Sequence, residues 1–217
     1  MREAGNQGGA TAPRSKRRRR GQLKSGPHGL TREEVAAHQS ARIQAAMSEL
    51  VAARGYDGTT VEEIVTRAGV SRKTFYERHK SREQWFIEIC QTAAGGLSDR
   101  ITRAGEAGGS RSERAARIST TLLGHWLDDP TSAHACFVET LAAGEQARAW
   151  RGQLLETLHT TIAQAIGGER APDIDRLATR AAVGAVLELV GHDAIQVDEQ
   201  QAVALIQTIL VTGEPPR

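Results

Sequence analysis

The sequence is poor in aromatic residues and cysteine and has no long apolar run, and each shortage excludes a class of protein. Aromatics make up 4% of the 217 residues. Cys90 and Cys136 form no CxxC pair, so we expect reduced, buried thiols. No apolar stretch approaches the roughly 20 residues that span a bilayer. No apolar signal-peptide core follows the basic N-terminal residues. These features predict a cytoplasmic protein without membrane association.

Sequence signatures of common catalytic sites are also missing. The chain contains no GxSxG, GxxxxGKS or HExxH, and no GxGxxG placed between a strand and a helix. His125, His134 and His159 lack the tight spacing of a metal site. The pair Asp128–Asp129 is better explained as a helix terminator than as an acid/base couple. We therefore expect no enzyme, no metal site and no cofactor.

Positive charge is concentrated at one end of the chain. Residues 1–30 carry a net charge of +7, residues 31–100 are neutral, and residues 101–217 carry −5. We expect residues 1–30 to be a disordered basic arm. Its run Arg17, Arg18, Arg19 and Arg20 is a candidate for contact with DNA phosphates or the minor groove. Two alternatives remain open: a solubilising tail, or a start codon assigned too early.

From Thr31 onward the pattern is helix after helix. Thr31 and Glu34 form a capping box. A stripe with the period of a helix follows at Ile43, Ala46, Met47, Leu50 and Val51. Further helices are predicted at about 82–104, 110–127, 131–143, 145–166, 173–191 and 199–212, and no segment alternates like a strand. The predicted fold class is all-α.

Residues 59–83 have the pattern of a helix-turn-helix. Thr60 and Glu63 form a second capping box, Gly69 ends the helix, and Ser71 can cap the next one. A short helix, a turn with glycine and a polar, basic second helix is the arrangement that places a recognition helix in the DNA major groove. The exposed positions of the second helix are expected to be Arg72, Lys73, Thr74, Tyr76 and Arg78.

These residues resemble a known family. Tyr56-x-x-Thr-Thr-Val-x-x-Ile (56–64), Ala-Gly-Val-Ser-x-x-Thr-Phe-Tyr (68–76) and Ser-Arg-Glu (81–83) are similar to the TetR family of bacterial transcriptional regulators, over about residues 38–90. The resemblance implies a homodimer that binds a palindromic DNA operator. It also implies a C-terminal domain that binds a small-molecule effector and changes the spacing of the DNA-binding heads.

The resemblance also implies roles for individual residues. Arg72, Lys73 and Thr74 stand where bases and backbone are contacted, and Tyr76 matches a phosphate-binding tyrosine. Arg78 and Arg82 replace a histidine and a lysine that are common there, and both keep a hydrogen-bond donor. The complete predicted DNA-binding set is Thr60, Ser71, Arg72, Lys73, Thr74, Tyr76, Arg78, Lys80 and Arg82, together with Arg17–Arg20. His79 stands where an apolar residue is usual, so it fills that core position as neutral imidazole or lies at its edge.

The rest of the chain is expected to hold the effector and the dimer contact. Candidate ligand-binding residues on the central helices are Trp126, Phe137, Trp150, Leu122, His125 and His159, with ordinary core packing as the alternative. They favour an apolar effector. The last two long helices have broad apolar faces with small residues between them. These faces favour a homodimer through a four-helix bundle, with packing inside the chain as the alternative.

The predicted organisation is an arm (1–30), a helix-turn-helix domain (31–80) and a ligand-binding and dimerisation domain (81–217). The predicted function is that of a sequence-specific regulator, most simply a repressor released by its effector. The alternative is a sequence-tolerant architectural DNA-binding protein, whose affinity would be similar for any duplex and fall steeply with salt.

Overall fold

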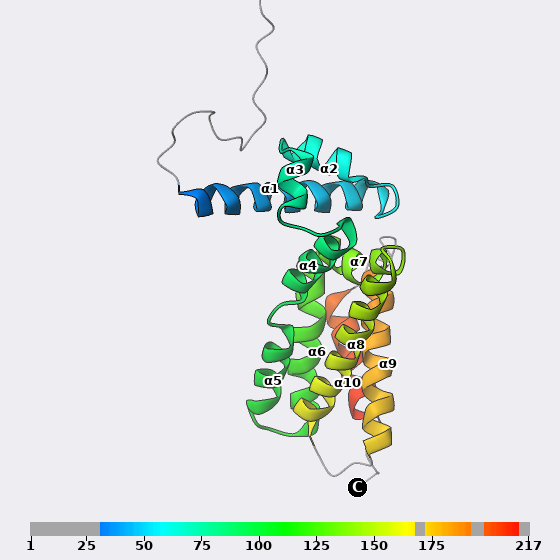
Figure 1. The fold of residues 1–217 in the computed structure, drawn as a ribbon. Helices are drawn as coiled ribbons and strands as arrows, with labels where there is room; N and C mark the ends of the chain where they lie inside the picture. Colours follow the sequence, from blue (N-terminus) through cyan, green and yellow to red (C-terminus); the bar gives the residue numbers. More distant parts are fainter. Residues whose placement is uncertain (1–30, 168–171, 192–197, 213–217) are drawn as a thin grey trace, which may run out of the picture.

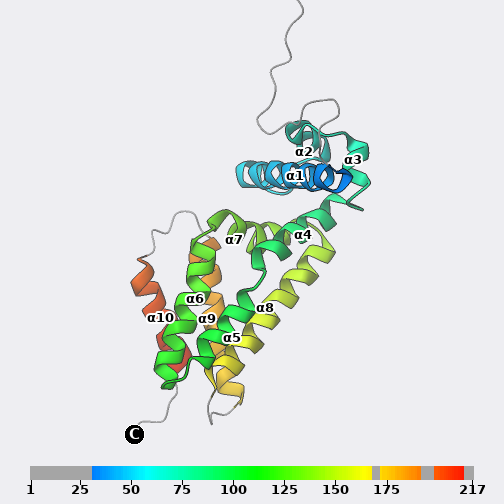
Figure 2. The same cartoon turned by 90° about the vertical axis from the view of Figure 1, so that its left-hand side faces the viewer.

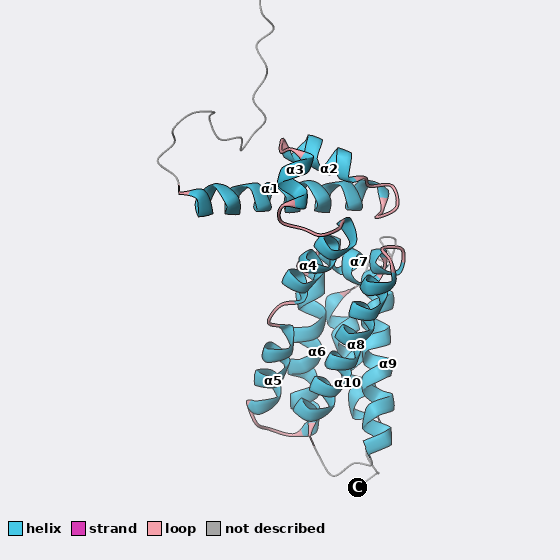
Figure 3. Cartoon of the chain, viewed as in Figure 1, coloured by secondary structure: helices cyan, strands magenta, loops and turns pink. Residues whose placement is uncertain are grey.

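The computed structural model describes residues 31–167, 172–191 and 198–212, and each regular element in these ranges is a helix (Figure 3). α1 (Arg32–Arg54), α2 (Val61–Ala68) and α3 (Arg72–Tyr76) form an N-terminal head. The predicted all-α fold is confirmed. Among the described helices, none is long and apolar enough to cross a membrane.

The remaining helices form an elongated body below the head (Figures 1 and 2). They are α4 (Arg82–Ala94), α5 (Leu97–Glu106), α6 (Arg111–Leu127), α7 (Pro130–Phe137), the 3-10 turn η1 (Glu139–Leu141), α8 (Glu145–Ile166), α9 (Pro172–Gly191) and α10 (Glu199–Val211). α6 packs against α5 and α10, while α8 packs against α5 and α9. α1 lies across the end of this bundle, and α4 connects the two parts (Figure 1).

Side-chain caps start the helices where the sequence predicts. Thr31 with Glu34, Thr60 with Glu63 and Ser110 with Glu113 each form a complete capping box, in which the hydroxyl and the carboxylate satisfy opposite backbone amides. Ser81 accepts a hydrogen bond from the Gln84 N–H and begins α4. Each cap is typically worth about 1 kcal/mol of helix stability.

The expectation of one continuous helix over about 82–104 is wrong. α4 ends at Ala94 and α5 begins at Leu97, with Gly95 and Gly96 between them. Gly96 has a φ of 72°, in the left-handed region that glycine adopts without a Cβ clash. The chain therefore bends at this pair and continues as a separate helix.

The buried apolar side chains form a continuous core from the head into the body. Phe75 on α3, Phe86 on α4 and Trp126 on α6 are almost completely buried. Cys90 and Cys136 are free and buried, as predicted. The Cys136 thiol lies 3.7 Å from the Cys90 carbonyl oxygen. Its hydrogen bonding with Cys90 and its burial raise its pKa far above the usual value, so it stays a protonated thiol.

Candidate DNA-binding surface and ligand pocket

α3 is a five-residue helix held by its N-cap and by one buried ring. Ser71 Oγ accepts a hydrogen bond from the Thr74 N–H at 3.0 Å and lies 2.9 Å from the Thr74 hydroxyl. Before it, Gly69 ends α2 in the left-handed conformation, with φ 65°. Phe75 is fully buried beneath α3. Because Phe75 fixes one side of the short helix, the other side is presented to solvent.

Arg42 supports the turn before α3, and no motif in the sequence indicates this role. Its guanidinium extends from α1 and donates to the carbonyl oxygens of Ala68 and Gly69, the latter at 2.8 Å. These oxygens lie at the C-terminal end of α2, where helical carbonyls lack partners within the helix. Arg42 therefore positions α3 against α1, although only the fold places it there.

Polar side chains of α3 and the following turn are exposed together. Arg72 is 3.6 Å from Glu62, and the Lys73 ammonium is 3.7 Å from Glu77. Both pairs are exposed, so they contribute little to stability and can exchange for phosphate oxygens. The exposed members of the predicted set near α3 are Ser71, Arg72, Lys73, Tyr76, Arg78 and Lys80, while Thr74 is half-buried.

Thr60 is exposed but already occupied within the capping box of α2. Its N–H donates to the Glu63 carboxylate at 3.0 Å, and its hydroxyl lies 2.9 Å from the same oxygen. These bonds, followed by one from Arg54, hold the pKa of Glu63 below its usual value. A phosphate at this helix start therefore has to compete with the Glu63 carboxylate.

Arg82 lies apart from the exposed set. Its guanidinium stacks 3.9 Å from the centroid of the Tyr56 ring and donates to the carbonyl oxygens of Tyr56 (3.2 Å) and Thr59. Burial raises the pKa of Tyr56, and Arg82 opposes this shift. These contacts fix the loop between α1 and α2. The phosphate contact predicted for Arg82 stays a prediction, as does that of Arg17–Arg20, which lie outside the described residues.

His79 fills the core position, one of the two placements that the sequence left open. Its ring is 5% exposed, and its centroid lies 3.6 Å from that of Trp85 and 5.4 Å from that of Phe75. Nδ1 lies 3.3 Å from the Glu88 carboxylate. Burial lowers the pKa of His79 and outweighs Glu88, which acts in the opposite direction. The imidazole is therefore neutral at pH 7.

Comparison with known proteins matches the head to a family. Residues 43–89 match the model described as bacterial regulatory proteins, tetR family. The head of this chain is therefore similar to the DNA-binding heads of tetR-family regulators. The matched residues 43–89 include the exposed surface of α3. No curated protein sequence matches the chain.

Solved tetR-type regulators share the fold of the head and the body. A tetR-family regulatory protein from Rhodococcus RHA1 superposes with a TM-score of 0.67 at 18% identity, covering 79% of this chain and 96% of that one. FadR from Bacillus subtilis, solved in complex with stearoyl-CoA, superposes with a TM-score of 0.64 at 20% identity, covering 81% of this chain and 99% of that one. The fatty acid degradation regulator FadR from Bacillus halodurans superposes with a TM-score of 0.66 at 18% identity, covering 90% of this chain and 100% of that one.

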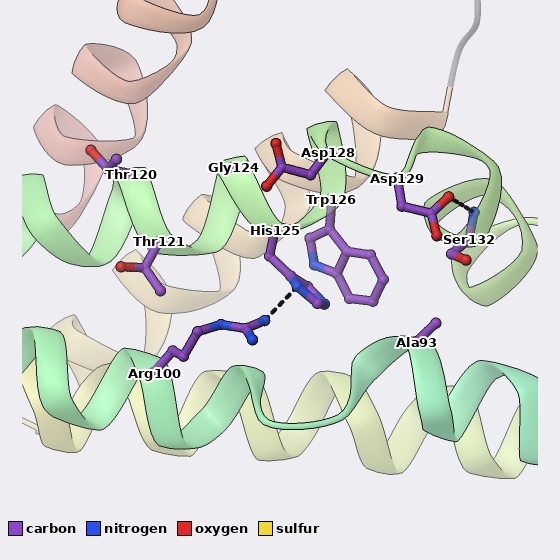
Figure 4. A pocket seen from close by; sticks show the side chains of 10 residues that line it. All are labelled: Ala93, Arg100, Thr120, Thr121, Gly124, His125, Trp126, Asp128, Asp129 and Ser132. Carbon is purple, nitrogen blue, oxygen red and sulfur yellow. Dashed lines mark hydrogen bonds between the residues drawn. The ribbon is translucent and has the colours of Figure 1, made fainter.

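The tetR-type body contains a hollow of about 560 Å³ between α6 and the α4–α5 junction (Figure 4). Of the six predicted ligand residues, it brings only His125 and Trp126 to the lining. The sequence did not indicate the other lining residues, because they come from four separate segments. The full lining is Ala93, Arg100, Thr120, Thr121, Gly124, His125, Trp126, Asp128, Asp129 and Ser132.

The other predicted ligand residues lie elsewhere in the tetR-type body. Leu122 and Phe137 are buried, and the Phe137 ring packs edge-on against Trp126 at 4.6 Å between centroids. Trp150 is partly buried against the core. His159 lies 3.7 Å from Glu156, and burial lowers its pKa. An apolar cavity bordered by these residues stays a prediction, and the hollow that is present has charged walls.

α4 lies against other parts of the body near both of its ends. Near its start, the Glu83 carboxylate accepts a hydrogen bond from the Ala147 N–H at 3.1 Å, which satisfies an amide at the beginning of α8. Near its end, Ala93 lines the hollow. A ligand in the hollow therefore touches the helix that continues from the head.

Proposed function

We propose that this protein is a repressor that binds a palindromic operator as a homodimer and is released by a small-molecule effector. The observation that carries the proposal is the exposed basic side of α3 in a tetR-family head. Arg72 and Lys73 are free to reach base edges or phosphates, since their ion pairs with glutamates are exposed and loose. Tyr76, at 48% exposure, can donate its hydroxyl to a phosphate.

Exposed apolar residues on the last two helices support the dimer. Leu177 on α9 is 71% exposed and Leu205 on α10 is 52% exposed. One and two helical turns after Leu177, Ala181 and Gly184 are also exposed, and a side chain added at Gly184 would meet no atom within 4 Å. Such a face, with small residues between leucines, allows the close helix approach of a four-helix dimer bundle.

The dimer is tested by changing the charge of this face. Leu177→Glu and Leu205→Glu together should shift the protein from dimer to monomer in analytical ultracentrifugation, because two carboxylates per subunit would be buried without partners. Leu141→Glu is the control, since Leu141 is 50% exposed on η1, which packs against α7 and α8. An unchanged sedimentation coefficient in the double variant would rule out this interface.

The effector part of the proposal rests on the hollow beside α4. The sequence favours an apolar effector, and the Bacillus subtilis FadR neighbour was solved with stearoyl-CoA. The hollow has charged walls, and α4 is the element through which occupancy would reach the head. Allostery of this kind requires that the effector bind one arrangement of α4 more tightly than the other.

Selection of bound DNA from a random pool tests the regulator itself. The expected result is an inverted repeat bound about 10³-fold or more tightly than random DNA. Arg72→Ala and Lys73→Ala should change the selected bases, whereas Tyr76→Phe should weaken binding to all sequences alike. Arg103→Ala, an exposed change on α5, is the control of equal charge. A pool that yields no motif would favour the sequence-tolerant DNA-binding protein instead.

A further inference from the structure

The hollow between α6 and the α4–α5 junction has groups of opposite charge on different walls. Arg100 enters from α5, and Asp128 and Asp129 stand at the end of α6 and the start of α7 (Figure 4). With His125 neutral, the lining carries one positive and two negative charges. A simple anion would face two carboxylates there, and a simple cation would face the guanidinium.

Arg100 keeps hydrogen-bond donors available for a ligand. Its Nη2 lies 2.5 Å from Nδ1 of His125. Burial first, and Arg100 second, lower the pKa of His125, so Nδ1 of the neutral ring accepts this hydrogen bond. No carboxylate pairs with Arg100 among the described residues. A guanidinium has five N–H donors in a planar fork that suits a carboxylate.

Trp126 provides an independent indication that the hollow is a ligand site. The residue is 1% exposed, its indole extends from α6 toward α4, and its Nε1 has no hydrogen-bond partner in the described part of the chain (Figure 4). Buried indole N–H groups normally find an acceptor. An acceptor in the hollow would satisfy Trp126 and Arg100 together.

The two aspartates offer acceptors at the other end. One oxygen of Asp129 accepts the Ser132 N–H at 3.0 Å and caps α7, which leaves its second oxygen available. Asp128 is exposed beside it. An ammonium group has three donors and suits such a pair.

We propose that this hollow binds a small zwitterion. The ligand carboxylate contacts Arg100 and the Trp126 N–H, and the ligand ammonium contacts Asp128 and the available oxygen of Asp129. Because Ala93 of α4 lines the same hollow, occupancy reaches the helix that leads to the head. The part of this inference that makes the zwitterion the effector rests on the proposed function.

Calorimetry on the full chain at pH 7.5 tests the binding with matched probes. The zwitterions are 3-aminopropanoate, 4-aminobutyrate and 6-aminohexanoate, each compared with the acid and the amine of equal chain length. The expected result is that at least one zwitterion binds about tenfold more tightly than both of its partners. Equal binding within every set, or no binding by any zwitterion, would overturn the site.

Variants then show which residues bind the carboxylate and which bind the ammonium of the ligand. Arg100→Gln should abolish the preference for the zwitterion over the amine. Asp128→Asn should abolish the preference for the zwitterion over the acid. Trp126→Phe keeps an aromatic ring, although a smaller one, and removes the N–H, so it should weaken binding of the zwitterion and the acid and spare binding of the amine. Arg103→Gln, exposed on the same helix as Arg100, is the control. A zwitterion preference that survives both Arg100→Gln and Asp128→Asn would place the ligand elsewhere and overturn the proposal.

DNA binding separates this inference from the proposed function. Gel shifts with the selected operator, with and without the best zwitterion, should show a loss of affinity of about tenfold or more, within the usual range of allosteric coupling. Zwitterion binding without a change in DNA affinity supports the site and refutes its role as effector site. Specific DNA binding by a protein that binds no zwitterion refutes the site and leaves the regulator standing.

Discussion

The carboxylate of Glu139 accepts a hydrogen bond from the backbone N–H of Tyr56, 83 residues earlier in the chain, at 2.5 Å. Its other oxygen lies 3.2 Å from Nε2 of His134. The Glu139 side chain is 14% exposed, so these bonds are largely shielded from water. One acidic side chain of the body therefore holds the α1–α2 loop of the head.

Removing this carboxylate should loosen the contact between head and body. Glu139→Ala is expected to lower the free energy of unfolding by about 1–3 kcal/mol, because the Tyr56 amide loses a charged acceptor in a part-buried position. Urea unfolding followed by circular dichroism measures the change. Glu106→Ala, an exposed change at the end of α5, should stay within about 0.5 kcal/mol of the unmodified protein. Equal losses in both variants would contradict a specific role for Glu139.

Arg82 is expected to act on DNA binding mainly through the loop that it holds. Arg82→Ala removes the donor of the Tyr56 and Thr59 carbonyls, so it should cost about 1–3 kcal/mol of stability and weaken DNA binding as well. Arg78→Ala should weaken DNA binding with little change in stability, since the hydrogen bond of its guanidinium to Gln39 is exposed. Thermal unfolding and gel shifts on both variants distinguish the roles. Full stability in Arg82→Ala would leave direct phosphate contact as its function.

Neutral, buried His79 should make the protein less stable in mild acid. Its pKa is lowered in the folded state, so the unfolded chain binds the proton more readily. The contribution of neutral His79 to the free energy of unfolding is therefore fully present above the unfolded pKa of about 6.5, and it is lost as the pH falls below that value. Between pH 7.5 and 5.5, the urea midpoint of the unmodified protein should fall further than that of His79→Leu.

Two other histidines act in the same direction as His79. The pKa values of His125 and His159 are also lowered by burial, so some acid sensitivity should remain in the His79→Leu variant. The difference between the two proteins isolates His79, whose neighbouring charges are Glu88 and Arg78. An identical fall in both midpoints would show that His79 titrates normally.

The basic arm should add a nonspecific electrostatic component to DNA binding. Deleting residues 1–25 removes Arg17–Arg20, so affinity should fall and the plot of log affinity against log salt should flatten by about 0.9 for each phosphate that the arm neutralises in the full-length protein. Gel shifts between about 50 and 200 mM salt measure this slope. Substitution of Arg17–Arg20 by glutamine in the full chain is the matched control for length. An unchanged slope would leave the arm as a solubilising tail.

The sequence predicted the head well because its signals are local. A capping box at Thr60 and Glu63, the stop at Gly69 and the cap at Ser71 each act within four residues, and all are present in the structure. The helix expected over about 82–104 is instead divided into α4 and α5 at Gly95–Gly96. At that point Gly96 has a left-handed φ.

The ligand hollow could not be predicted in the same way. Apolar and aromatic spacing indicated Trp126, Phe137 and Trp150, yet only Trp126 reaches the lining. Arg100, the guanidinium of the hollow, is set against His125 by the packing of α5 on α6, which no local pattern encodes.

By itself, the sequence determined an all-helical chain with a tetR-type head, a basic α3 and a charged N-terminal arm. Short-range forces are enough for this, since caps, glycine stops and apolar periodicity act within one or two helical turns. Tertiary structure alone decided that Arg82 holds the Tyr56 loop, that Glu139 ties the head to the body, and that Arg100 and the aspartates share one hollow. Those relationships join residues far apart in the chain, and only the packing of helices around the common core brings them together.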